Sequence, residues 1–540
     1  MIIRFSIQCQ VQIRKATLPV MPNLARGDYD GIRSFFQTIR WRTMLEGRNI
    51  HEMWELFKRT LTEAQSKFIP MKRQREGKSV KPIWFNNLVR QCFNGKKGAF
   101  SKMKTNPSAE NKANYIQARR TLKKSIRKAK RASEINLANE CEGDLKKFFG
   151  FYKFNKHDSR IGPIESDHHV YHDDADKVRI FNDQFSSVFT DECLTNFPNN
   201  LLHSKSQPKL TNIHLSEDDI TKTLCDLKAN KSSGPDNIST RVLKEGSREL
   251  SMPLSIIFEE SIESGEIPED WRCANVVPIF KGGNKTVVSN YRPISLTSVV
   301  CKVLERVIKR QIVAYFEEHT VLLSSQHGFC SGRSCLTNLL DFLEYSTDAL
   351  DKGDRVSVVY LDFSKAFDKI PHKRLLISLE SHGLDGPLLK WIGAWLLGRK
   401  QRVIVNGHQS EWKAVKSGVP QGTVLAPLLF IIFVNLIDSD LTSNIWKFAD
   451  DIKIARNVTS EDDKRALQAD LDALLKWSKE WQMEFNVDKC KVLHLGVNNN
   501  DTYDLNGTKL AIVNEEKDLR VLVTSDLKLS GHYMQARKKL

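Results

Sequence analysis

Two adjacent carboxylates lie at the centre of an apolar segment of this chain. Asp450 and Asp451 follow Phe448-Ala449 inside the run from Ile445 to Ile454, and this pattern predicts a strand, a tight turn and a second strand. Upstream, another predicted strand, Val356 to Leu361, ends directly in Asp362. A fold that places these strands side by side would bring three carboxylates together.

Such a cluster restricts the chemistry of the site. Like charges a few ångströms apart raise one another's pKa, so three carboxylates stay ionised only when cations bind them. Two divalent ions about 4 Å apart can activate an attacking hydroxyl and stabilise a leaving phosphate oxygen. The pattern therefore favours nucleotidyl transfer. The alternatives are a turn with solvated side chains for the Asp-Asp pair and a helix cap or turn former for Asp362.

Three motifs in a fixed order favour the catalytic interpretation of these aspartates over a turn or a helix cap. They are Leu361-Asp362-Phe363-Ser364-Lys365-Ala366-Phe367-Asp368, Ser417-Gly418-Val419-Pro420-Gln421-Gly422-Thr423-Val424-Leu425-Ala426-Pro427-Leu428-Leu429-Phe430, and Phe448-Ala449-Asp450-Asp451. In this order they closely resemble the palm of reverse transcriptases encoded by non-LTR (LINE-like) retrotransposons, with the jockey and CR1 branches most similar in wording.

The resemblance extends in both directions along the chain, over about Ser232 to Asp526. The further matching segments are Trp271 to Gly283, Asn290 to Leu296, Gln326 to Phe329, Gly332 to Ser334, Trp481 to Gly496 and Asp518 to Val523. It implies an α/β right-hand polymerase with fingers and a palm, in which helices cover an antiparallel palm sheet, preceded by a basic helical extension.

The expected domains follow from this resemblance. We expect a basic helical N-terminal extension over 1–155, a linker with one helix over 156–215, fingers and palm over 216–526 with core motifs at 271–526, and the start of a thumb over 527–540. The helix in the linker is expected at Ala175 to Phe189. Ahead of the polymerase there is no room for the endonuclease that intact members of the family usually carry, so we expect a copy lacking that domain and most of the thumb.

The resemblance also implies roles for single residues. Asp362, Asp450 and Asp451 are the expected ligands of two Mg²⁺ ions, which Mn²⁺ could replace. Lys489 is the expected proton donor to departing pyrophosphate, although Lys491 is two positions away. The expected nucleotide contacts are Lys281, Arg292, Phe363, Phe367, Gln421 and Gly422.

Physical arguments support several of these roles. An aromatic ring at Phe367, under the incoming sugar, would collide with a 2′-hydroxyl and favour deoxynucleotides; the alternative is a core aromatic. The Gln421-Gly422 turn can approach a nucleotide closely through glycine's permissive dihedral angles. Lys281 and Arg292 are cations suited to a triphosphate, and their alternative is a solvated surface.

The charge of the chain fits a polyanionic partner. Lys and Arg number 82 against 65 Asp and Glu, a formal net charge of +17, which suits salt-sensitive binding to nucleic acid. The resemblance implies an RNA template, a DNA primer or target and dNTPs as partners. It also makes Arg333, in Gly332-Arg333-Ser334, an expected nucleic-acid contact.

A basic amphipathic helix is predicted in the N-terminal third. Seven cations form two rows with a spacing of four residues, and Leu122, Ile126 and Ala129 mark the other side. These cations are Arg119, Lys123, Arg127 and Arg131 in one row and Arg120, Lys124 and Lys128 in the other. We favour binding to a nucleic-acid backbone; the alternatives are a solvated charged helix and a nuclear-localisation patch.

Cysteine usage and hydropathy indicate an intracellular protein. Ten cysteines occur without a C-x-x-C pair, so neither a disulfide framework nor a zinc ribbon is predicted. The longest apolar run, Val424 to Ile437, contains Pro427 and Asn435 and is shorter than the roughly 20 residues that a bilayer requires. It predicts a buried palm helix. We expect no membrane association and a location in the nucleus and in cytoplasmic ribonucleoprotein, and the oligomeric state stays open.

Three residues depart from the family pattern. Arg520 stands where glycine is usual, Cys330 replaces a basic residue, and Ala426 replaces a glycine before Pro427. Glycine commonly permits a backbone conformation that arginine resists. Beside the RNA-directed DNA polymerase we therefore keep a second hypothesis, a catalytically inactive nucleic-acid-binding remnant.

Overall fold

The chain divides into two compact units. The computed structural model describes residues 20–73, 82, 84–140, 161–198, 208–496 and 501–539. One unit comprises 1–23 and 70–161, and the other comprises 24–69 and 162–540. Residues 24–69 thus belong with the polymerase motifs, whereas the sequence grouped them with the N-terminal extension. The predicted extension and linker also include 1–19, 141–160 and 199–207, which lie outside the described residues.

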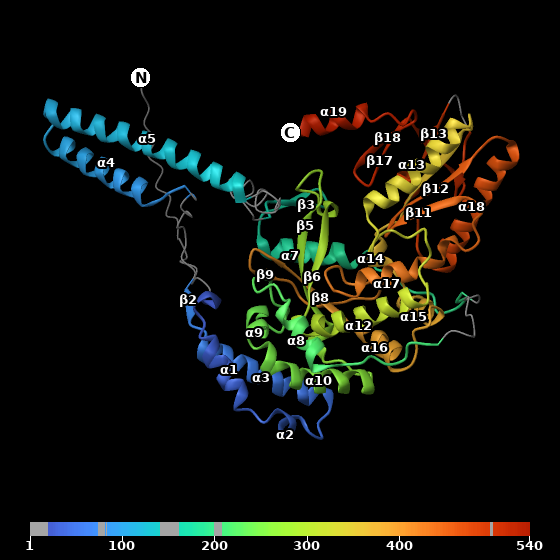
Figure 1. The fold of residues 1–540 in the computed structure, drawn as a ribbon, viewed down its shortest axis with the longest axis horizontal. Coiled ribbons are helices and arrows are strands. Elements are labelled where there is room, and N and C mark those ends of the chain that lie inside the picture. Colours follow the sequence, from blue (N-terminus) through green and yellow to red (C-terminus); the bar gives the residue numbers. More distant parts are fainter. Residues whose placement is uncertain are drawn as a thin grey trace. The chain divides into compact units, whose positions relative to one another are not determined.

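The first unit is a helical hairpin, seen as two long antiparallel helices in Figure 1. Its elements are β1 (Val20–Pro22), β2 (Met71–Arg73), α4 (Asn87–Thr105) and α5 (Ala109–Glu140), with β1 antiparallel to β2. Val89, Leu122 and Ala129 are buried in its small core. All seven predicted cations of α5 are exposed, which confirms the amphipathic basic helix.

A helical layer of the second unit packs around tryptophans. It contains α1 (Tyr29–Gln37), α2 (Trp41–Leu45), α3 (Ile50–Phe68), α8 (Glu217–Cys225), α9 (Thr240–Glu245), α10 (Ser247–Ser264) and α11 (Glu269–Arg272). Trp54 packs edge-on against Trp271 with ring centroids 5.3 Å apart, and both side chains are buried. The Trp54 indole and the Lys58 ammonium donate hydrogen bonds to Asp270. Burial of these large apolar surfaces explains why 24–69 belongs to this unit.

One sheet of the second unit carries the fingers motifs. Its strands follow the order β10-β8-β5-β6, and β9 pairs with β8. The bounds are β5 (Cys273–Phe280), β6 (Tyr291–Leu296), β8 (Lys400–Val405), β9 (His408–Gln409) and β10 (Lys413–Ala414). The helix predicted in the linker is α7 (Asp174–Ser186), where Phe181 packs edge-on against Tyr291 of β6.

The palm sheet has the strand order β11-β12-β7-β13-β16. Its strands are β7 (Val356–Asp362), β11 (Asn444–Phe448), β12 (Asp451–Asn457), β13 (Lys491–Leu495) and β16 (Ala511–Val513). All neighbours are antiparallel except β13 and β16, so the predicted antiparallel palm sheet is confirmed.

Different helices cover the two faces of this sheet. Val356 and Val358 belong to one apolar cluster with Phe342 of α13 (Cys335–Asp351). Val359 and Leu361 belong to another, with α17 (Ala426–Phe433) and α18 (Glu461–Glu480). Successive strand side chains point to opposite faces, so a strand apolar on both lies between two layers.

Of the apolar run from Val424 to Ile437, Ala426–Phe433 form α17 and the last residues belong to the 3-10 helix η3 (Asn435–Asp438); the residues of α17 are buried apart from Pro427. This confirms the predicted palm helix. Within the described residues no helix is long and apolar enough to cross a bilayer. The other elements are η1 (Leu24–Arg26), β3 (Ile164–Ser166), β4 (His169–Tyr171), η2 (Val288–Asn290), α12 (Val299–Glu318), α14 (Ala366–Lys369), α15 (His372–Ser381), α16 (Gly386–Leu396), η3 (Asn435–Asp438), η4 (Val487–Lys489), β14 (Asp504–Leu505), β15 (Thr508–Lys509), β17 (Glu515–Asp518), β18 (Val521–Thr524) and α19 (Ser530–Lys539).

Candidate active site

The strand register brings the three predicted carboxylates to one end of the palm sheet. Pairing of β12 with β7 sets Asp451 opposite Asp362, and pairing of β11 with β12 sets Phe448 opposite Asp451. Ala449 and Asp450 form the two-residue turn between the strands. The predicted hairpin and its position beside Asp362 are therefore confirmed.

The backbone of the turn is unusual for its residue type. Ala449 has φ of +58°, a left-handed conformation that side chains other than glycine seldom adopt. Positive φ at the first turn position matches the twist of the flanking strands. Asp450 lines one cavity at this edge and Asp451 a second, while Asp362 lines both.

Electrostatics at this edge favour a bound cation. Desolvation and the neighbouring Asp450 and Asp362 raise the pKa of Asp451 to about 6. Desolvation also raises the pKa of Asp450, against the lowering effect of Arg292. A cation bound between these groups would offset the desolvation and the mutual repulsion, so three carboxylates fit a hard divalent ion.

The carboxylates are not preassembled around an ion position. Among the described residues, no three acidic, histidine or cysteine side chains converge as a coordination sphere. The Asp362 carboxylate accepts a hydrogen bond from the Lys489 ammonium at 2.9 Å. Ion binding would therefore require these side chains to turn toward a shared position.

A cavity of about 640 Å³ opens beside Asp362 and Asp450. Its lining brings together residues from the fingers sheet, the end of β7, the Pro-Gln-Gly loop, the turn between β11 and β12, and η4 (Val487–Lys489). The predicted site residues in its wall are Lys281, Arg292, Asp362, Phe363, Phe367, Gln421, Asp450 and Lys489. Burial and the nearby Arg292 and Lys489 lower the pKa of Lys281.

Two phenylalanines of this wall differ in their packing. The Phe367 ring is half-buried and stacks on Phe430 with centroids 4.5 Å apart. Phe363 is only 5% exposed and stacks on Phe485. Phe367 can therefore present a ring edge to a ligand, whereas the ring of Phe363 belongs mainly to the core.

The Pro-Gln-Gly loop is held against both the palm and the fingers. The side-chain amide of Gln421 donates to Asp368 at 3.1 Å, and the backbone carbonyl of Gln421 accepts from the backbone N–H of Ser295 in β6. Gly422 has φ of +109°, and a Cβ there would lie 2.8 Å from the Ser295 carbonyl. Gly422 is not in the cavity wall, so its contribution is the close approach of loop and strand.

The two candidate lysines have different partners. Lys489 lines the cavity and pairs with Asp362, whereas Lys491 pairs with Glu516 at 3.2 Å. The geometry therefore favours Lys489 as the lysine nearest the reacting groups.

Asp368 and Glu305 were not among the predicted site residues, although both hold the Pro-Gln-Gly loop. Burial raises the pKa of Asp368 to about 6, and this carboxyl accepts the Gln421 hydrogen bond. The fully buried Glu305 of α12 accepts from the backbone N–H groups of Val424 and Leu425 at the start of α17. A lone acid in the otherwise apolar buried face of α12 was the available sequence signal for Glu305.

For one of the three departures from the family pattern, Arg520, the structure shows why glycine would fit better. Arg520 has φ of +76° and Leu519 has φ of +43° between β17 and β18. This confirms that Arg520 occupies a conformation that glycine adopts more easily. Ala426 is buried in the first turn of α17, and the Cys330 thiol donates to the Gly328 carbonyl at 3.4 Å.

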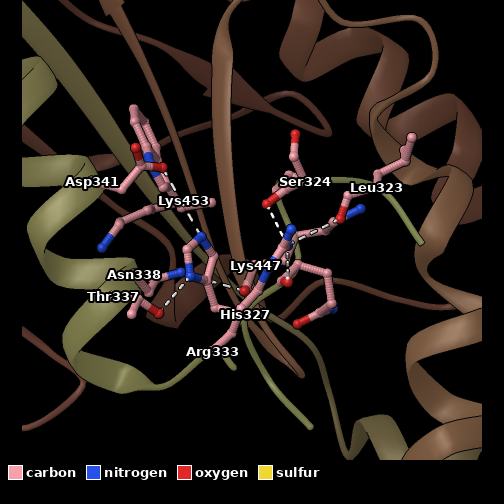
Figure 2. Close-up of polar contacts among 12 residues, drawn as sticks. Leu323, Ser324, His327, Arg333, Thr337, Asn338, Asp341, Lys447 and Lys453 are labelled. Carbon is pink, nitrogen blue, oxygen red and sulfur yellow. Dashed lines mark hydrogen bonds and ion pairs between the residues drawn. The ribbon is translucent and has the colours of Figure 1, made fainter. Parts of the chain in front are cut away.

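The remaining predicted nucleic-acid contacts are outside this cavity. The seven cations of α5 lie in the first unit. Arg333 points its guanidinium at backbone carbonyls of its own loop (Figure 2).

Comparison with known proteins agrees with this site. Residues 280–524 match the family of reverse transcriptases (RNA-dependent DNA polymerases). The RNA-directed DNA polymerase from mobile element jockey of Drosophila funebris is 28% identical over 329 residues, which cover 58% of this chain and 36% of that protein. The probable RNA-directed DNA polymerase from transposon BS of Drosophila melanogaster is 28% identical over 283 residues, covering 50% and 31%. A solved apo telomerase of Candida tropicalis, truncated from its C-terminal domain, gives a TM-score of 0.35 at 13% identity over 54% of this chain and 68% of that chain.

The fold is therefore that of the right-hand polymerase class, and residues 280–524 match its reverse transcriptase domain. Within that class the chain is similar in sequence to the RNA-directed DNA polymerases of mobile elements such as jockey and transposon BS. It spans about a third of the length of these curated relatives, 36% and 31%.

Proposed function

We propose that this chain is an RNA-directed DNA polymerase that adds deoxynucleotides to a primer 3′-hydroxyl on an RNA template. The observation that carries the proposal is the 640 Å³ cavity, whose wall contains eight residues predicted from sequence motifs that are far apart along the chain. Separate motifs would have no reason to converge on one cavity if each were only a turn or a surface patch.

The carboxylates of Asp362, Asp450 and Asp451 would hold two Mg²⁺ ions, or Mn²⁺ in their place. When bound, the pair would supply activation of the primer hydroxyl and charge stabilisation of the leaving pyrophosphate. The raised pKa values of Asp450 and Asp451 support this assignment, because they arise from desolvation and, to a smaller extent, from carboxylate repulsion, and a bound cation would offset both.

The cavity wall would position the nucleotide. Lys281 and Arg292 would pair with the triphosphate, and arginine can contact two phosphate oxygens at once. Phe367 would lie under the sugar, where its ring excludes a 2′-hydroxyl. Gln421, fixed by Asp368, would approach the nucleotide from the loop.

Lys489 would transfer a proton to the leaving pyrophosphate. Its ammonium lies 2.9 Å from the Asp362 carboxylate. When Asp362 turns to bind an ion, this ion pair would break, and the Lys489 ammonium could then contact the phosphate. Protonating the leaving pyrophosphate lowers the charge that develops on it.

The helical hairpin of α4 and α5, which we call the basic hairpin, would add a second surface that binds nucleic acid. Exposed cations in two helical rows can follow phosphates without reading sequence. We include in the proposal a location in the nucleus and in cytoplasmic ribonucleoprotein, where template RNA and target DNA are found.

The test is primer extension on a primed RNA template with dNTPs and Mg²⁺, using the full chain. We expect extension that stops when EDTA is added and that does not occur with rNTPs alone. If a folded chain binds the primed template but extends nothing with Mg²⁺ or Mn²⁺, the inactive nucleic-acid-binding remnant is the correct function.

A further inference from the structure

The hairpin of β11 and β12, which we call the catalytic hairpin, is bordered by a segment to which the proposed polymerase function assigns no role. β11 is the edge strand of the palm sheet, and the segment Ser325–Gly328 lies along that edge. The backbone N–H of Lys447 donates to the Ser325 carbonyl, and the N–H of His327 donates to the Lys447 carbonyl, both at 2.8 Å. These two bonds cover β11 immediately before the turn that carries Asp450.

The Gln326 side chain continues past the strand to the turn itself. It is fully buried, and its carboxamide oxygen accepts from the N–H groups of Gly328 at 2.8 Å and Ala449 at 3.1 Å. Only the oxygen of the amide can accept two donors, which fixes the orientation of the side chain. Gly328 is needed here, because a Cβ would lie 2.5 Å from the Ala449 nitrogen.

Ala449 is the residue that needs this hydrogen bond. Its left-handed backbone is unfavourable for a residue with a Cβ. A buried acceptor aimed at its N–H favours that conformation over the alternatives, in which the N–H would be left unsatisfied. Since Asp450 follows directly, the direction of its carboxylate depends on the conformation of Ala449.

The segment is itself held in place from two sides. Arg333 Nη1 donates to the carbonyls of Ser324 and Gln326, each at 2.6 Å, and to that of Leu323 at 3.3 Å. Figure 2 shows this guanidinium among the carbonyl groups of the loop, with the His327 imidazole beside Thr337 of α13. Charge-assisted bonds from an always protonated group keep the loop in one conformation.

α13 and η3 fix the same strand. Asn338 of α13 donates to the Lys447 carbonyl at 3.3 Å. The buried Lys447 ammonium donates to Asp438 at 2.7 Å and to the Asn435 carbonyl at 3.0 Å. The strand before the turn is therefore held through both its backbone and its side chain.

We propose that Gln326 is a positioning residue for Asp450 and Asp451, and that Arg333 maintains Gln326 in its position. Gln326, Gly328 and Arg333 together form what we call the hairpin brace. The inference deepens the proposed polymerase function and rests on it. It also reassigns Arg333, which the sequence predicted as a nucleic-acid contact, to a role inside the protein.

Gln326→Met tests the brace, because methionine has a similar shape and lacks the acceptor. We expect kcat for dNTP addition to fall about 100-fold, as for a small misplacement of catalytic groups, while KM for dNTP changes less than about threefold. Gln326→Glu keeps an oxygen acceptor, and burial keeps its carboxyl neutral, so it should restore most of kcat. A residue needed only for folding would not show this split or this rescue.

Two further measurements do not depend on activity. In Gln326→Met, hydrogen exchange in the peptide that covers residues 444–452 should be faster, and the affinity for Mn²⁺, followed by electron paramagnetic resonance, should fall about tenfold. Wild-type kcat, exchange and Mn²⁺ affinity in a folded Gln326→Met protein would overturn the inference. If the wild-type chain itself extends no primer, the polymerase proposal fails, while exchange and Mn²⁺ binding still decide the role of Gln326.

Arg333→Gln provides a second variant at an exposed position that should not disturb the core. We expect lower kcat and faster exchange at 444–452, with unchanged RNA affinity and salt dependence. If kcat and exchange are unchanged while the salt dependence of RNA binding decreases by about one phosphate contact, Arg333 contacts nucleic acid and the brace assignment is wrong.

Discussion

The basic hairpin and the catalytic edge of the palm use charged side chains in opposite ways. The seven cations of α5 are all exposed, so their side chains can reach a phosphate. At the palm edge Lys489 contacts Asp362 and Gln421 contacts Asp368. Exposed charges give graded binding, whereas mutually oriented groups give chemistry that a single change can abolish. Substitutions should therefore have very different effects in the two regions.

The largest effect is expected at the turn of the catalytic hairpin. Asp450→Asn removes one anionic ligand of the proposed metal pair, and primer extension should become undetectable. The metal-free protein should unfold at the same temperature or higher, because desolvation and repulsion already raise the pKa of Asp450. Extension assays with a thermal unfolding scan measure both.

Asp440→Asn is the matched control, since Asp440 is an exposed aspartate. It should leave extension unchanged. Near wild-type extension by Asp450→Asn would show that the Asp450 carboxylate is not needed for catalysis. A single substitution would then have only a small effect at the palm edge, as in the basic hairpin.

The next largest effect is expected for the two rows of cations on α5, which form one basic stripe along the helix. Replacing Lys123, Lys124, Arg127 and Lys128 with Gln keeps helix propensity and removes four charges. RNA affinity should fall, and the slope of log K against log salt should decrease by about 3 for single-stranded RNA. Sequence preference should hardly change, because phosphate contacts do not read bases.

The same number of charges can be removed from the neighbouring helix as a control. Lys96, Lys97, Lys102 and Lys104 are spread around α4, so their replacement with Gln should reduce the slope less. Equal losses in both variants would show that overall charge, and not the stripe, is responsible.

A smaller and more specific effect is expected at the sugar. Phe367→Ala should reduce discrimination against ribonucleotides by about tenfold or more, because the clash with the 2′-hydroxyl disappears. Incorporation efficiencies for dNTP and rNTP, compared for wild type and variant, measure it. Phe363→Leu, at a core position, should leave the ratio unchanged, and an unchanged ratio in Phe367→Ala would make Phe367 a core residue too.

A pH-dependent effect is expected at Asp236, away from the predicted site residues. Burial raises its pKa from 3.8 to about 6, so the folded state favours the protonated form. The stabilisation is complete below the unfolded pKa and is lost as pH rises through 6. Asp236→Asn should therefore stabilise the protein at pH 7.5, by about 3 kcal/mol, and have a smaller effect near pH 4.5.

Thermal unfolding at the two pH values tests this sign, with the exposed Asp351→Asn as control. A stability gain that is equal at both pH values would show that the buried charge of Asp236 is not its cause.

The smallest effect is expected in the turn between β17 and β18. Arg520→Gly should stabilise this hairpin by about 1 kcal/mol, because glycine accepts the positive φ without a Cβ clash. Hydrogen exchange of residues 515–524 should slow about fivefold. Arg520→Ala keeps the Cβ and should give little of this gain; equal gains would assign the effect to the arginine side chain.

Local patterns were sufficient for the elements of the site. The hairpin around Asp450, the strand ending in Asp362, the buried helix from Ala426 and the basic helix α5 all agree with the sequence, because each depends on hydrophobic periodicity within one short segment. The resemblance predicted Lys281, Phe367 and Gln421 as nucleotide contacts, and the structure brings the three residues into the wall of one cavity.

Other features depended on contacts between distant segments. The sequence placed 24–69 in the N-terminal extension, since it could not show that Trp54 would pack on Trp271. It predicted a nucleic-acid contact for Arg333, which stays a prediction, and did not show that this guanidinium donates to the carbonyls of Ser324 and Gln326. Glu305 and Gln326 were missed as site residues for the same reason: their partners, Val424 and Ala449, are more than a hundred residues away.

The sequence by itself determined the types of group available for catalysis and the strands and helices that carry them. Only the tertiary structure decided which of those groups meet, and which neighbouring side chains hold them in direction. The physical reason is that periodicity and turn preference act over a few residues, whereas the orientation of Asp450 depends on a buried hydrogen bond from Ala449 to Gln326 that exists only after the chain has folded.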